Sequence, residues 1–384
     1  MNFENKKKIV FCLPCFITGG VERVAVTYLN ALAEFKNYDV SLFISGFVDD
    51  GFLLNQISSN VRKIFLRQQK TNKPKTSLKR KLWKLRALFF RIYDIWLFRK
   101  ILKFADIVVD FKNGETLEPY VPYSHQKMLV WFHGAVKSCQ KRCSKKALEK
   151  YDCIIALSQA FKTECEAKFP WTKGKISVLY NPFQLEKIRA LADDVSALSE
   201  DDENLLAQDY FVHVSRVAPD KDIKTLIDAY ICFAKDKKGK IPLLYIIGDG
   251  SDRAKHQKRI EEMELQKQIK LLGEKENPFV WMKYAKALIL SSKNEGFGCV
   301  LVEALAVGTK VISANCPAAP AEILEQGRIG LLFEPSNYKE LAVKLDDVWR
   351  GKAILPSQEE IQKSLLRFDE KTVLQQFVKL LNNF

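Results

Sequence analysis

Apolar residues follow two spacings along this chain, and the two alternate from one end to the other. Residues 8–15 form a short, nearly unbroken apolar run of the kind that builds a buried strand. Residues 21–35 follow, and there Val21, Tyr28 and Leu32 recur at helical spacing, which predicts an amphipathic helix. Further strands are predicted at 40–45, 61–66, 107–110, 128–132 and 153–157, with helices between them.

The same alternation starts again near residue 210. Strands are predicted at 210–215, 243–248, 269–272, 287–291 and 310–314. Helices are predicted at about 222–236, 251–266, 278–284 and 299–307. Strands that are separated by helices form parallel, doubly wound sheets, so the pattern indicates two such sheets.

The length of 384 residues also favours two domains, each with its own core. Pro182 bars helix continuation between the two series, and an acidic stretch at 193–203 follows it. We therefore predict an α/β protein in which two Rossmann-like domains, 1–182 and 183–365, face each other across a cleft. A C-terminal helix within 366–384 can pack back on the first domain.

The composition is that of a globular protein, with 47% hydrophobic and 28% charged residues, but the formal net charge of +15 is unevenly placed. Residues 73–103 contain eleven Lys or Arg and one acid, Asp94, which gives +10; residues 137–150 contain six Lys or Arg and Glu149, which gives +5. The remainder is neutral. A localised basic face indicates an anionic partner, although a merely solvated surface stays open for the shorter cluster.

The longer basic segment, residues 73–104, is also amphipathic. Its apolar positions recur every three or four residues, at Leu78, Leu82, Leu85, Phe89, Ile92 and Trp96. Cations with interspersed aromatic side chains suit a helix that lies on an anionic membrane surface or grips a phosphorylated acceptor. The alternative is that the apolar stripe belongs to the core and the lysines face water. We favour contact with the membrane or a polyanion.

No nucleic-acid partner is predicted, because the chain has no recognised nucleic-acid recognition motif. No stretch of 18 uncharged apolar residues could span a bilayer. The apolar run after Lys8 resembles a signal peptide but lacks a small-residue cleavage site. We expect a cytoplasmic protein that is peripherally associated with the inner face of the cytoplasmic membrane.

Nine cysteines, an odd number, fit a reducing compartment better than a disulfide framework. Cys12 and Cys15 form a CxxC motif within an apolar strand. A redox pair, or a zinc site completed by Cys139 and Cys143, is the alternative to simple packing. We favour packing and predict no metal site.

The most informative segment follows the predicted strand 287–291. It reads NEGFG at 294–298, after which a helix that contains Glu303 begins. Glycines at a helix start let backbone N–H groups approach a phosphate. Helical spacing predicts that Glu303 and Glu295 lie on similar faces, where carboxylates can accept hydrogen bonds from sugar hydroxyls. The alternative is an ordinary strand–turn–helix with two surface acids.

Three other turns at strand ends are candidate ligand contacts. Arg216 and Lys221 are placed to neutralise a diphosphate, with Arg as a planar fork and Lys as a point charge. Gly248 is predicted to bring backbone near the ligand. Gly19 and Gly20 open the first helix but are too short for the GxGxxG dinucleotide fingerprint. Each of these signals is weak alone.

Together these motifs resemble those of the family 4 glycosyltransferases, a large group of retaining enzymes with the two-domain GT-B fold. Residues 292–306 (SKNEGFGCVLVEALA) look like the family's E-x7-E element in full. Residues 308–313 look like its G-x-P-V-I-x strand, with a Thr-Lys pair where proline is common. Residues 314–323 resemble a variant frequent among bacterial lipopolysaccharide and lipid-linked oligosaccharide transferases. The likeness covers essentially the whole chain and is strongest over 211–335.

The resemblance implies roles for the matching residues. Arg216 and Lys221 would hold the donor diphosphate, Glu303 the nucleotide ribose and Glu295 the transferred sugar. His133, which follows the predicted strand 128–132, matches the family's histidine near the reacting sugar, and we favour that role over a structural one. Backbone beside the donor would come from Gly19, Gly20, Gly296, Phe297 and Gly298.

The resemblance also implies a mechanism without a metal cofactor. The family is thought to retain the anomeric configuration by a same-face, oxocarbenium-like substitution in which the leaving diphosphate helps to deprotonate the acceptor. Arg216, Lys221 and helix-terminal N–H groups would stabilise the growing charge on the leaving group. Asp249 and Asp252 are three positions apart, so they do not form a DxD triplet.

The implied donor is a nucleotide sugar, with UDP-linked galactose, glucose or an N-acetylhexosamine expected. The implied acceptor is a glycolipid or oligosaccharide, such as lipopolysaccharide or a lipid-linked oligosaccharide. Two other classes stay open: a Rossmann-type nucleotide-binding oxidoreductase, and a basic polyanion-binding protein without catalysis. A sugar-nucleotide phosphorylase or epimerase of the same fold is a weaker alternative.

Overall fold

The computed structural model describes residues 6–17, 19–48, 51–66, 92–93, 95–117, 120–139, 145–196, 198–235, 237, 239–317 and 319–384. The chain divides into two compact units. The N-terminal unit comprises Met1–Leu157, Lys162–Leu179 and Leu374–Phe384, and the C-terminal unit comprises Ser158–Phe161 and Tyr180–Val373. Each unit is described by itself below.

Within the described residues, the N-terminal unit contains one parallel sheet of seven strands in the order β3-β2-β1-β4-β5-β6-β7. The strands are β1 (Lys7–Leu13), β2 (Tyr38–Ile44), β3 (Arg62–Phe65), β4 (Ile107–Asp110), β5 (Lys127–Phe132), β6 (Cys153–Ala156) and β7 (Ile176–Val178). Phe11 of β1 pairs with Leu42 of β2 on one side and Val109 of β4 on the other. The central strands are mostly apolar because both faces of the sheet are covered.

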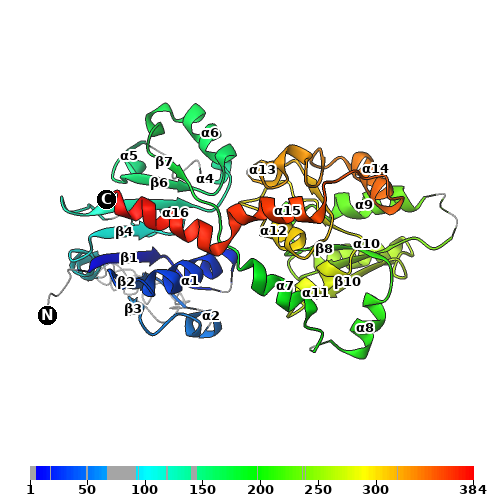
Figure 1. Ribbon diagram of the computed structural model, residues 1–384, viewed down its shortest axis with the longest axis horizontal. Helices are drawn as coiled ribbons and strands as arrows, with labels where there is room; N and C mark the ends of the chain where they lie inside the picture. The colour runs from blue at the N-terminus through cyan, green and yellow to red at the C-terminus, as the bar shows by residue number, and fades with distance from the viewer. Residues whose placement is uncertain are drawn as a thin grey trace, which may run out of the picture. The chain divides into compact units, whose positions relative to one another are not determined.

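Helices join these strands and cover the sheet (Figure 1). They are α1 (Gly20–Ala33), α2 (Gly51–Asn55), α4 (Val136–Cys139), α5 (Lys145–Leu148) and α6 (Gln159–Lys168). The C-terminal helix α16 (Glu370–Asn382) lies beside α1, where the Phe377 ring is 5.1 Å from Tyr28 and 5.3 Å from Trp131. The Lys7 ammonium donates to the carbonyl oxygen of Leu381 at 3.0 Å. An aromatic core thus joins the last helix to the first unit.

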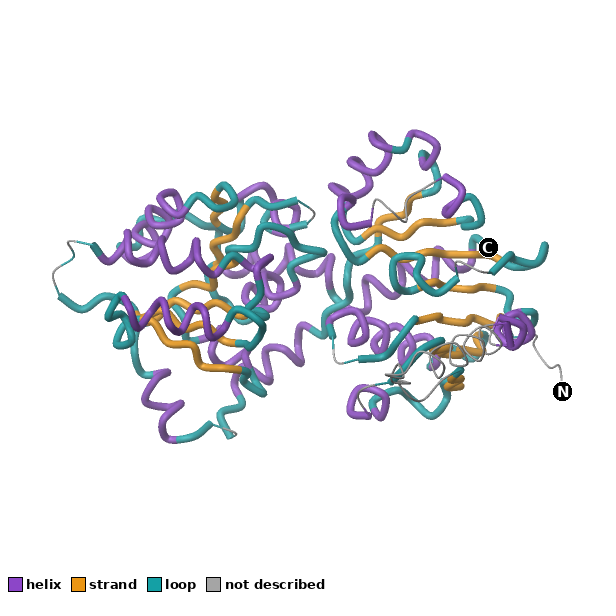
Figure 2. Tube along the Cα trace, turned by 180° about the vertical axis from the view of Figure 1, so that it is seen from behind, coloured by secondary structure: helices purple, strands orange, loops and turns teal. Residues whose placement is uncertain are grey.

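The described part of the C-terminal unit contains one parallel sheet of six strands in the order β10-β9-β8-β11-β12-β13 (Figure 2). The strands are β8 (Tyr210–Val214), β9 (Leu243–Ile247), β10 (Ile269–Gly273), β11 (Ala287–Leu290), β12 (Val311–Ala314) and β13 (Leu331–Phe333). The helices are α7 (Leu185–Asp193), α8 (Glu200–Leu206), α9 (Ile223–Ala234), α10 (Arg253–Glu262), α11 (Pro278–Lys283), α12 (Cys299–Ala306), α13 (Pro320–Ile323), α14 (Tyr338–Trp349) and α15 (Gln358–Leu365). The core is packed mainly from β8, β9, β11, α9 and α14.

Both sheets reverse their direction of growth at one point, and this fixes where a ligand can bind. In the N-terminal unit the chain builds outward from β1 to β3 and then returns to add β4 on the other side of β1. In the C-terminal unit it returns between β8 and β11. The loops that follow the two strands at such a point run in opposite directions and leave a crevice at the carboxyl edge.

The predicted α/β class and the two doubly wound sheets are confirmed, and most predicted strands and helices lie within two or three residues of their observed bounds. The prediction omits β7 and β13, which have three residues each and therefore give no periodic signal. It also gives no bounds for α7, α13, α14 and α15, and it misses α8, which begins within the acidic stretch. The Ser199 hydroxyl caps α8 by accepting from Asp202 N at 3.2 Å.

Candidate functional site

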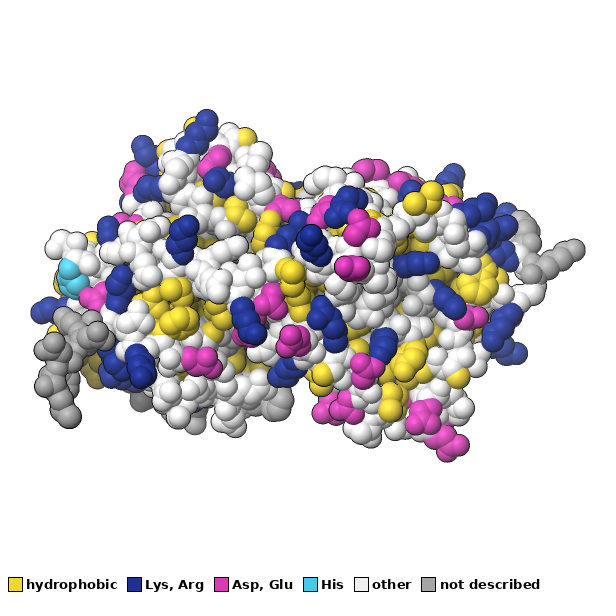
Figure 3. Space-filling view, in the orientation of Figure 1, with side chains coloured by type: hydrophobic (Ala, Val, Ile, Leu, Met, Phe, Trp, Pro, Cys, Tyr) yellow, Lys and Arg dark blue, Asp and Glu magenta, His cyan; other side chains and the backbone are white. Residues whose placement is uncertain are grey.

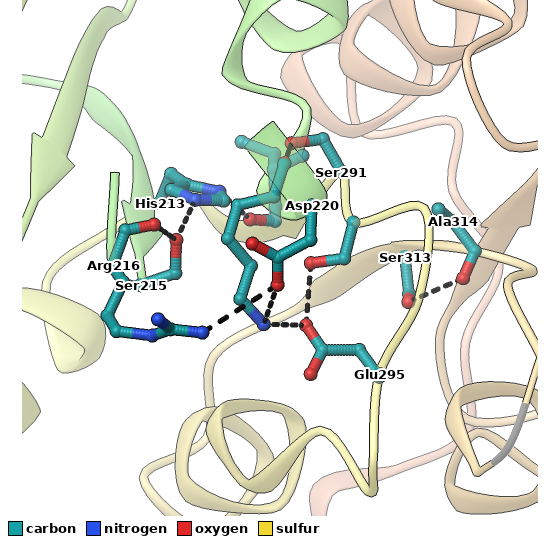
Figure 4. A network of polar contacts seen from close by, with 11 residues as sticks. His213, Ser215, Arg216, Asp220, Ser291, Glu295, Ser313 and Ala314 are labelled. Atoms are coloured by element: carbon teal, nitrogen blue, oxygen red, sulfur yellow. Dashed lines mark hydrogen bonds and ion pairs between the residues drawn. The ribbon is translucent and has the colours of Figure 1, made fainter. Parts of the chain in front are cut away.

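Three predicted donor-site residues of the C-terminal unit, Arg216, Lys221 and Glu295, lie in the loops that follow β8 and β11, at the β8/β11 crevice. Figure 4 shows Arg216 and Glu295 among the polar contacts of these loops. Gly248 follows β9, and Glu303 lies in α12. β8 ends at Val214, and the chain continues through Arg216 into the short 3-10 helix η2 (Pro219–Lys221). β11 ends at Leu290, and the following loop carries Glu295. The two loops come from adjacent strands, so residues 74 positions apart meet.

A short ion pair joins these loops. The Lys221 ammonium lies 2.7 Å from Oε1 of Glu295, and the two side chains are only 13% and 10% exposed. The Ser292 hydroxyl donates to the same carboxylate oxygen at 2.6 Å, and the Ser291 hydroxyl donates to the carbonyl oxygen of Lys221 at 2.8 Å. A largely buried ammonium and carboxylate held in one geometry can bind an anionic group and a hydroxyl group side by side.

Arg216 is held much more loosely than Lys221. Its side chain is 75% exposed, and its guanidinium lies 3.8 Å from the Asp220 carboxylate. Such an exposed pair adds little stability, because water screens it and both side chains lose rotamer freedom. The guanidinium is therefore accessible to a planar anionic ligand such as a phosphate.

Gly248 supports the Arg216 loop from behind. Its φ of +124° lies in a region that favours glycine, and a Cβ at this position would come 1.9 Å from the carbonyl oxygen of Ser215. Gly250 approaches Val217 in the same way, with a Cβ-to-oxygen distance of 2.5 Å. Gly248 thus lies against the Arg216 loop, and its backbone N–H donates to the carbonyl oxygen of Gly273 at 2.7 Å. Its predicted contact with a ligand stays a prediction.

The glycine segment behaves as a tight lead into α12. Gly298 caps the helix with a φ of +96°. The Phe297 side chain is buried among the rings of Tyr180, Phe183 and Phe368, so only its backbone can face a ligand. The first N–H groups of α12 thus follow Gly296 and Phe297 directly, as an anion-binding helix start requires.

Glu295 and Glu303 do not share a helical face, which corrects the sequence-based interpretation. Glu295 lies in the loop before α12, and Glu303 is the fifth residue of that helix, so the spacing of 3.6 residues per turn does not relate them. Glu303 instead lies near Cys299 at the helix start. Burial, with the charges of Glu303 and Glu295 acting in the same direction, raises the pKa of the Cys299 thiol to about 12.

In the N-terminal unit the predicted residues gather near the β1/β4 crevice. Gly19 precedes α1 with an extended backbone, and a Cβ there would come 2.7 Å from Oε2 of Glu22. Glu22 is buried and accepts from the Lys112 ammonium at 2.8 Å. Gly20 opens α1 with no atom within 4 Å of an added Cβ. A buried ion pair therefore lies directly under the Gly19–Gly20 turn, and Gly20 has open space beside it.

His133 follows β5, as predicted, and its backbone N–H donates to Oδ1 of Asn113 at 2.9 Å. Its ring lies between Phe111, at 4.8 Å, and Trp131, which stacks on it at 6.1 Å. Burial lowers the pKa of the imidazole to about 3, and the charge of Lys112 acts in the same direction. The ring is thus neutral at pH 7. Its buried Nε2 has no hydrogen-bond partner among the described residues.

Sequence reasoning missed the loop after β4, which connects these residues. Lys112 holds Glu22, Asn113 holds the backbone of His133, and the N–H of Leu117 donates to the Asp110 carboxylate at 3.0 Å. Asn113 and Gly114 both have positive φ values, 56° and 77°. The available signal was the Asn-Gly pair just past an apolar strand, which marks a special turn but not what the turn positions.

The predicted basic helix falls largely outside the described residues, which leave out 67–91 and 94. Two positions of its apolar stripe are described, Ile92 and Trp96, and both are exposed, whereas Phe98 and Leu102 of the same segment are buried in the core. On the face drawn in Figure 3, basic and acidic side chains of the described residues are interspersed. No helix in the described part of the chain is long and apolar enough to cross a membrane.

The cysteines that the structure describes are all unpaired by disulfides, and Cys12 is buried in β1. The Cys15 sulfur lies 3.8 Å from the Lys112 ammonium. Cys143 and the side chain of Cys139 lie outside the described residues, so the zinc-site alternative stays an expectation from the sequence. Packing accounts for Cys12.

Two protein families match most of the chain between them. The family described as "Glycosyltransferase Family 4" matches residues 18–187, and the one described as "Glycosyl transferases group 1" matches residues 197–364. The first match includes the Gly19–Gly20 turn and His133. The second includes Arg216, Lys221 and the 292–306 segment.

Two individual relatives are similar to this chain over only about half of its length. An uncharacterized glycosyltransferase of Methanocaldococcus jannaschii is 31% identical over 176 residues, which are 45% of this chain and 42% of that protein. The lipopolysaccharide 1,6-galactosyltransferase of Escherichia coli K12 is 28% identical over 202 residues, 51% of this chain and 52% of that protein. The chain thus matches about half the length of these curated relatives.

Solved structures share the fold over nearly the whole chain. HepE of Anabaena, solved in complex with UDP and glucose, superposes with a TM-score of 0.74 at 20% identity and covers 98% of this chain and 100% of its own. At that identity the similarity establishes the two-sheet architecture alone. The fold, the two family matches and the positions of the motifs therefore agree with one another.

Proposed function

Because the chain belongs to the family 4 glycosyltransferases and has their GT-B fold, we propose that it is a retaining glycosyltransferase. It moves a hexose or an N-acetylhexosamine from a nucleotide sugar, with UDP as the nucleotide, to a glycan acceptor. The observation that carries this proposal is the Lys221–Glu295 pair at the β8/β11 crevice. An ammonium and a carboxylate fixed 2.7 Å apart suit a ligand with a phosphate next to a sugar.

In this proposal the donor diphosphate lies against Arg216, Lys221 and the first N–H groups of α12. These groups stabilise the negative charge that grows on the leaving diphosphate as the glycosidic bond breaks. Glu295 accepts a hydrogen bond from a hydroxyl of the transferred sugar, and Glu303 holds the ribose. The UDP in the complex of HepE supports the choice of nucleotide.

The N-terminal unit supplies the second group of proposed contacts. The Gly19–Gly20 turn offers backbone to the diphosphate, since open space adjoins Gly20. His133 acts as a neutral imidazole near the reacting sugar, because burial keeps the pKa of its ring near 3. In this proposal, a hydroxyl group forms a hydrogen bond with Nε2 of His133, which has no partner among the described residues.

We further propose that transfer needs no metal cofactor. In this proposal, Arg216, Lys221 and the first N–H groups of α12 take the place of a metal as the groups that stabilise the charge of the leaving diphosphate. The leaving diphosphate takes the proton of the acceptor hydroxyl on the face from which it departs. Retention of the anomeric configuration follows from that same-face attack.

The proposed acceptor is a lipopolysaccharide or a lipid-linked oligosaccharide at an anionic membrane surface. The galactosyltransferase of Escherichia coli, which acts on lipopolysaccharide, supports this acceptor class. The exposed side chains of Trp96, Phe104 and Val121 are 56%, 64% and 69% accessible, and the Lys100 ammonium lies 5.3 Å from the Trp96 ring centre. Aromatic side chains with adjacent cations are suited to the headgroup region of an anionic leaflet.

A thermal-shift panel with UDP, GDP, ADP and NAD tests the donor proposal. A ligand that binds only the folded state at a hundredfold excess over Kd raises the midpoint by about 5–10 °C for a unit of this size. We expect that shift with UDP and its loss in Lys221→Met. Lys286→Met is the matched control, since Lys286 also forms a 2.7 Å ion pair, with Asp209, but at the amino end of β11.

The readout is the shift that the ligand causes, so a lower starting midpoint in either variant does not affect the comparison. A shift with NAD alone would favour the oxidoreductase alternative. The absence of a shift with all four nucleotides, or an equal UDP shift in Lys221→Met, would contradict the proposed donor site.

A further inference from the structure

A chain of three polar contacts runs from β11 through β8 to the backbone of Arg216 (Figure 4). His213, in β8, is fully buried, and its Nδ1 lies 2.8 Å from the carbonyl oxygen of Ile289. Its Nε2 lies 2.7 Å from the hydroxyl oxygen of Ser215. That hydroxyl lies 2.8 Å from the carbonyl oxygen of Arg216. All three separations are those of strong hydrogen bonds.

The number of hydrogens available decides which contacts are hydrogen bonds. The series of three contacts begins and ends at a backbone carbonyl oxygen, which only accepts. Each of the three contacts therefore needs its own hydrogen. A neutral imidazole provides one N–H and Ser215 provides one O–H, which together fill two contacts. The third is filled only when His213 carries protons on both nitrogens. When the His213 imidazole is neutral, the three contacts thus lack one hydrogen.

The surroundings oppose that extra proton while the crevice is empty of ligand. Burial lowers the pKa of the His213 imidazole to about 4, and the positive charge of Lys221 acts in the same direction. The other charged groups of the network are Arg216 from the loop, Asp220 from η2 and Glu295 from the loop after β11. An anion bound to Arg216 and Lys221 would offset the opposing positive charge and raise the pKa of the imidazole.

We propose that His213 takes up one proton from solvent when the diphosphate of the donor binds at Arg216 and Lys221, and that the completed chain then fixes the Arg216 loop. This inference rests on the proposed function. No covalent bond changes: the proton comes from bulk water or buffer and returns there when the nucleotide leaves. His213 acts through Ser215, so it is a positioning residue for Arg216.

Two consequences follow from linkage between proton and nucleotide binding. Nucleotide affinity rises as the pH falls, by at most tenfold per pH unit for one proton. The rise is confined to pH values at which the imidazole is neutral in the free protein and protonated in the complex. A residue that merely packs in the core gives no such dependence, so the pH profile separates a structural role from the proposed one.

Isothermal titration calorimetry of the protein with UDP, at pH 7.0 in PIPES, HEPES and Tris buffers, measures the number of protons taken up on binding. The slope of observed enthalpy against buffer ionisation enthalpy equals the number of protons taken up. We expect a positive slope of up to one proton for the wild type. His213→Asn and Ser215→Ala, which remove the titrating group and the link, are each expected to reduce it.

His256→Asn is the matched control, because His256 is also a buried histidine of the C-terminal unit but lies in α10. The terminal phosphate of UDP titrates near pH 6, and its own contribution is common to all the variants. The inference is overturned, with the donor site intact, if UDP binds and the wild-type slope equals that of His213→Asn. A wild type that does not bind UDP at all overturns the proposed donor together with this inference.

Discussion

At the scale of single residues, the donor-site proposal depends on how differently its two cations are held. Lys221 is largely buried and forms a 2.7 Å ion pair with Glu295, whereas Arg216 is exposed and its pairing with Asp220, at 3.8 Å, is looser. The ion pair orients Lys221 in advance, so less side-chain entropy is lost when an anion binds. Arg216 must be ordered on binding, and this is why the state of its loop backbone matters.

Asp110 gives a prediction at the same scale. Its carboxyl is fully buried at the end of β4, accepts from the Tyr151 hydroxyl and leaves Oδ1 without a partner among the described residues. Burial raises the pKa of Asp110 to about 6, so between about pH 4 and 6 the folded state keeps a proton that the unfolded state has lost. Folding stability therefore falls as the pH rises through this window, by about 3 kcal/mol.

Asp110→Asn removes the titrating group but keeps an oxygen that can accept from Tyr151. We expect the variant to lack that part of the pH dependence and to be at least as stable as the wild type at pH 7.5. Urea unfolding at pH 4.5 and 7.5, followed by tryptophan fluorescence, compares the two proteins. The same loss of stability with pH in both would show that Asp110 is not its source.

At the scale of elements, apolar patterning predicts most of the strands and several of the helices. The bounds of β4 are predicted to the residue, and α16 lies within the predicted 366–384, because each is a clear apolar run or stripe. β7 and β13 are not predicted, because a strand of three residues is too short to show a period. The Glu295–Glu303 spacing misleads because a helix period was applied across a loop.

The loop after β4 shows the same limit at the candidate site. Lys112 and Asn113 tie Glu22 and His133 together through contacts 90 and 20 residues apart in sequence. The glycine turn before α1 indicated Gly19, and the family resemblance with its place after a predicted strand indicated His133. Nothing in the local sequence indicates the partners of Lys112, because they are set by which strands are neighbours in the sheet.

The exposed segment around Trp96 gives the prediction at this scale. The wild type is expected to co-sediment with vesicles of 30% phosphatidylglycerol in phosphatidylcholine, less so at high salt, and not with phosphatidylcholine alone. Replacing Trp96 and Phe104 by serine is expected to reduce the bound fraction several-fold. Phe35→Ser, which alters an exposed aromatic side chain just after α1, is the control. Equal binding to both vesicles, or no effect of the double variant, would contradict the membrane proposal.

At the scale of the whole molecule, the two units repeat one design. Each is a parallel sheet that reverses its growth once, and each brings its predicted residues to the carboxyl edge near that reversal. In the first unit these are Gly19, Gly20 and His133, and in the second Arg216, Lys221 and Glu295. This architecture follows from the sequence pattern, whereas the identity of the sugar depends on side-chain detail that no motif specifies.

Turnover of nucleotide sugars in the presence of EDTA tests the central claim most directly. The protein is incubated with UDP-glucose, UDP-galactose and UDP-N-acetylglucosamine, and proton NMR follows UDP release and the anomer that forms first. We predict release of UDP from at least one donor, with the α configuration kept, and a loss of about 100-fold or more in Lys221→Met. A first product of β configuration, turnover that appears only when Mg²⁺ is restored, or full activity in Lys221→Met would contradict the account.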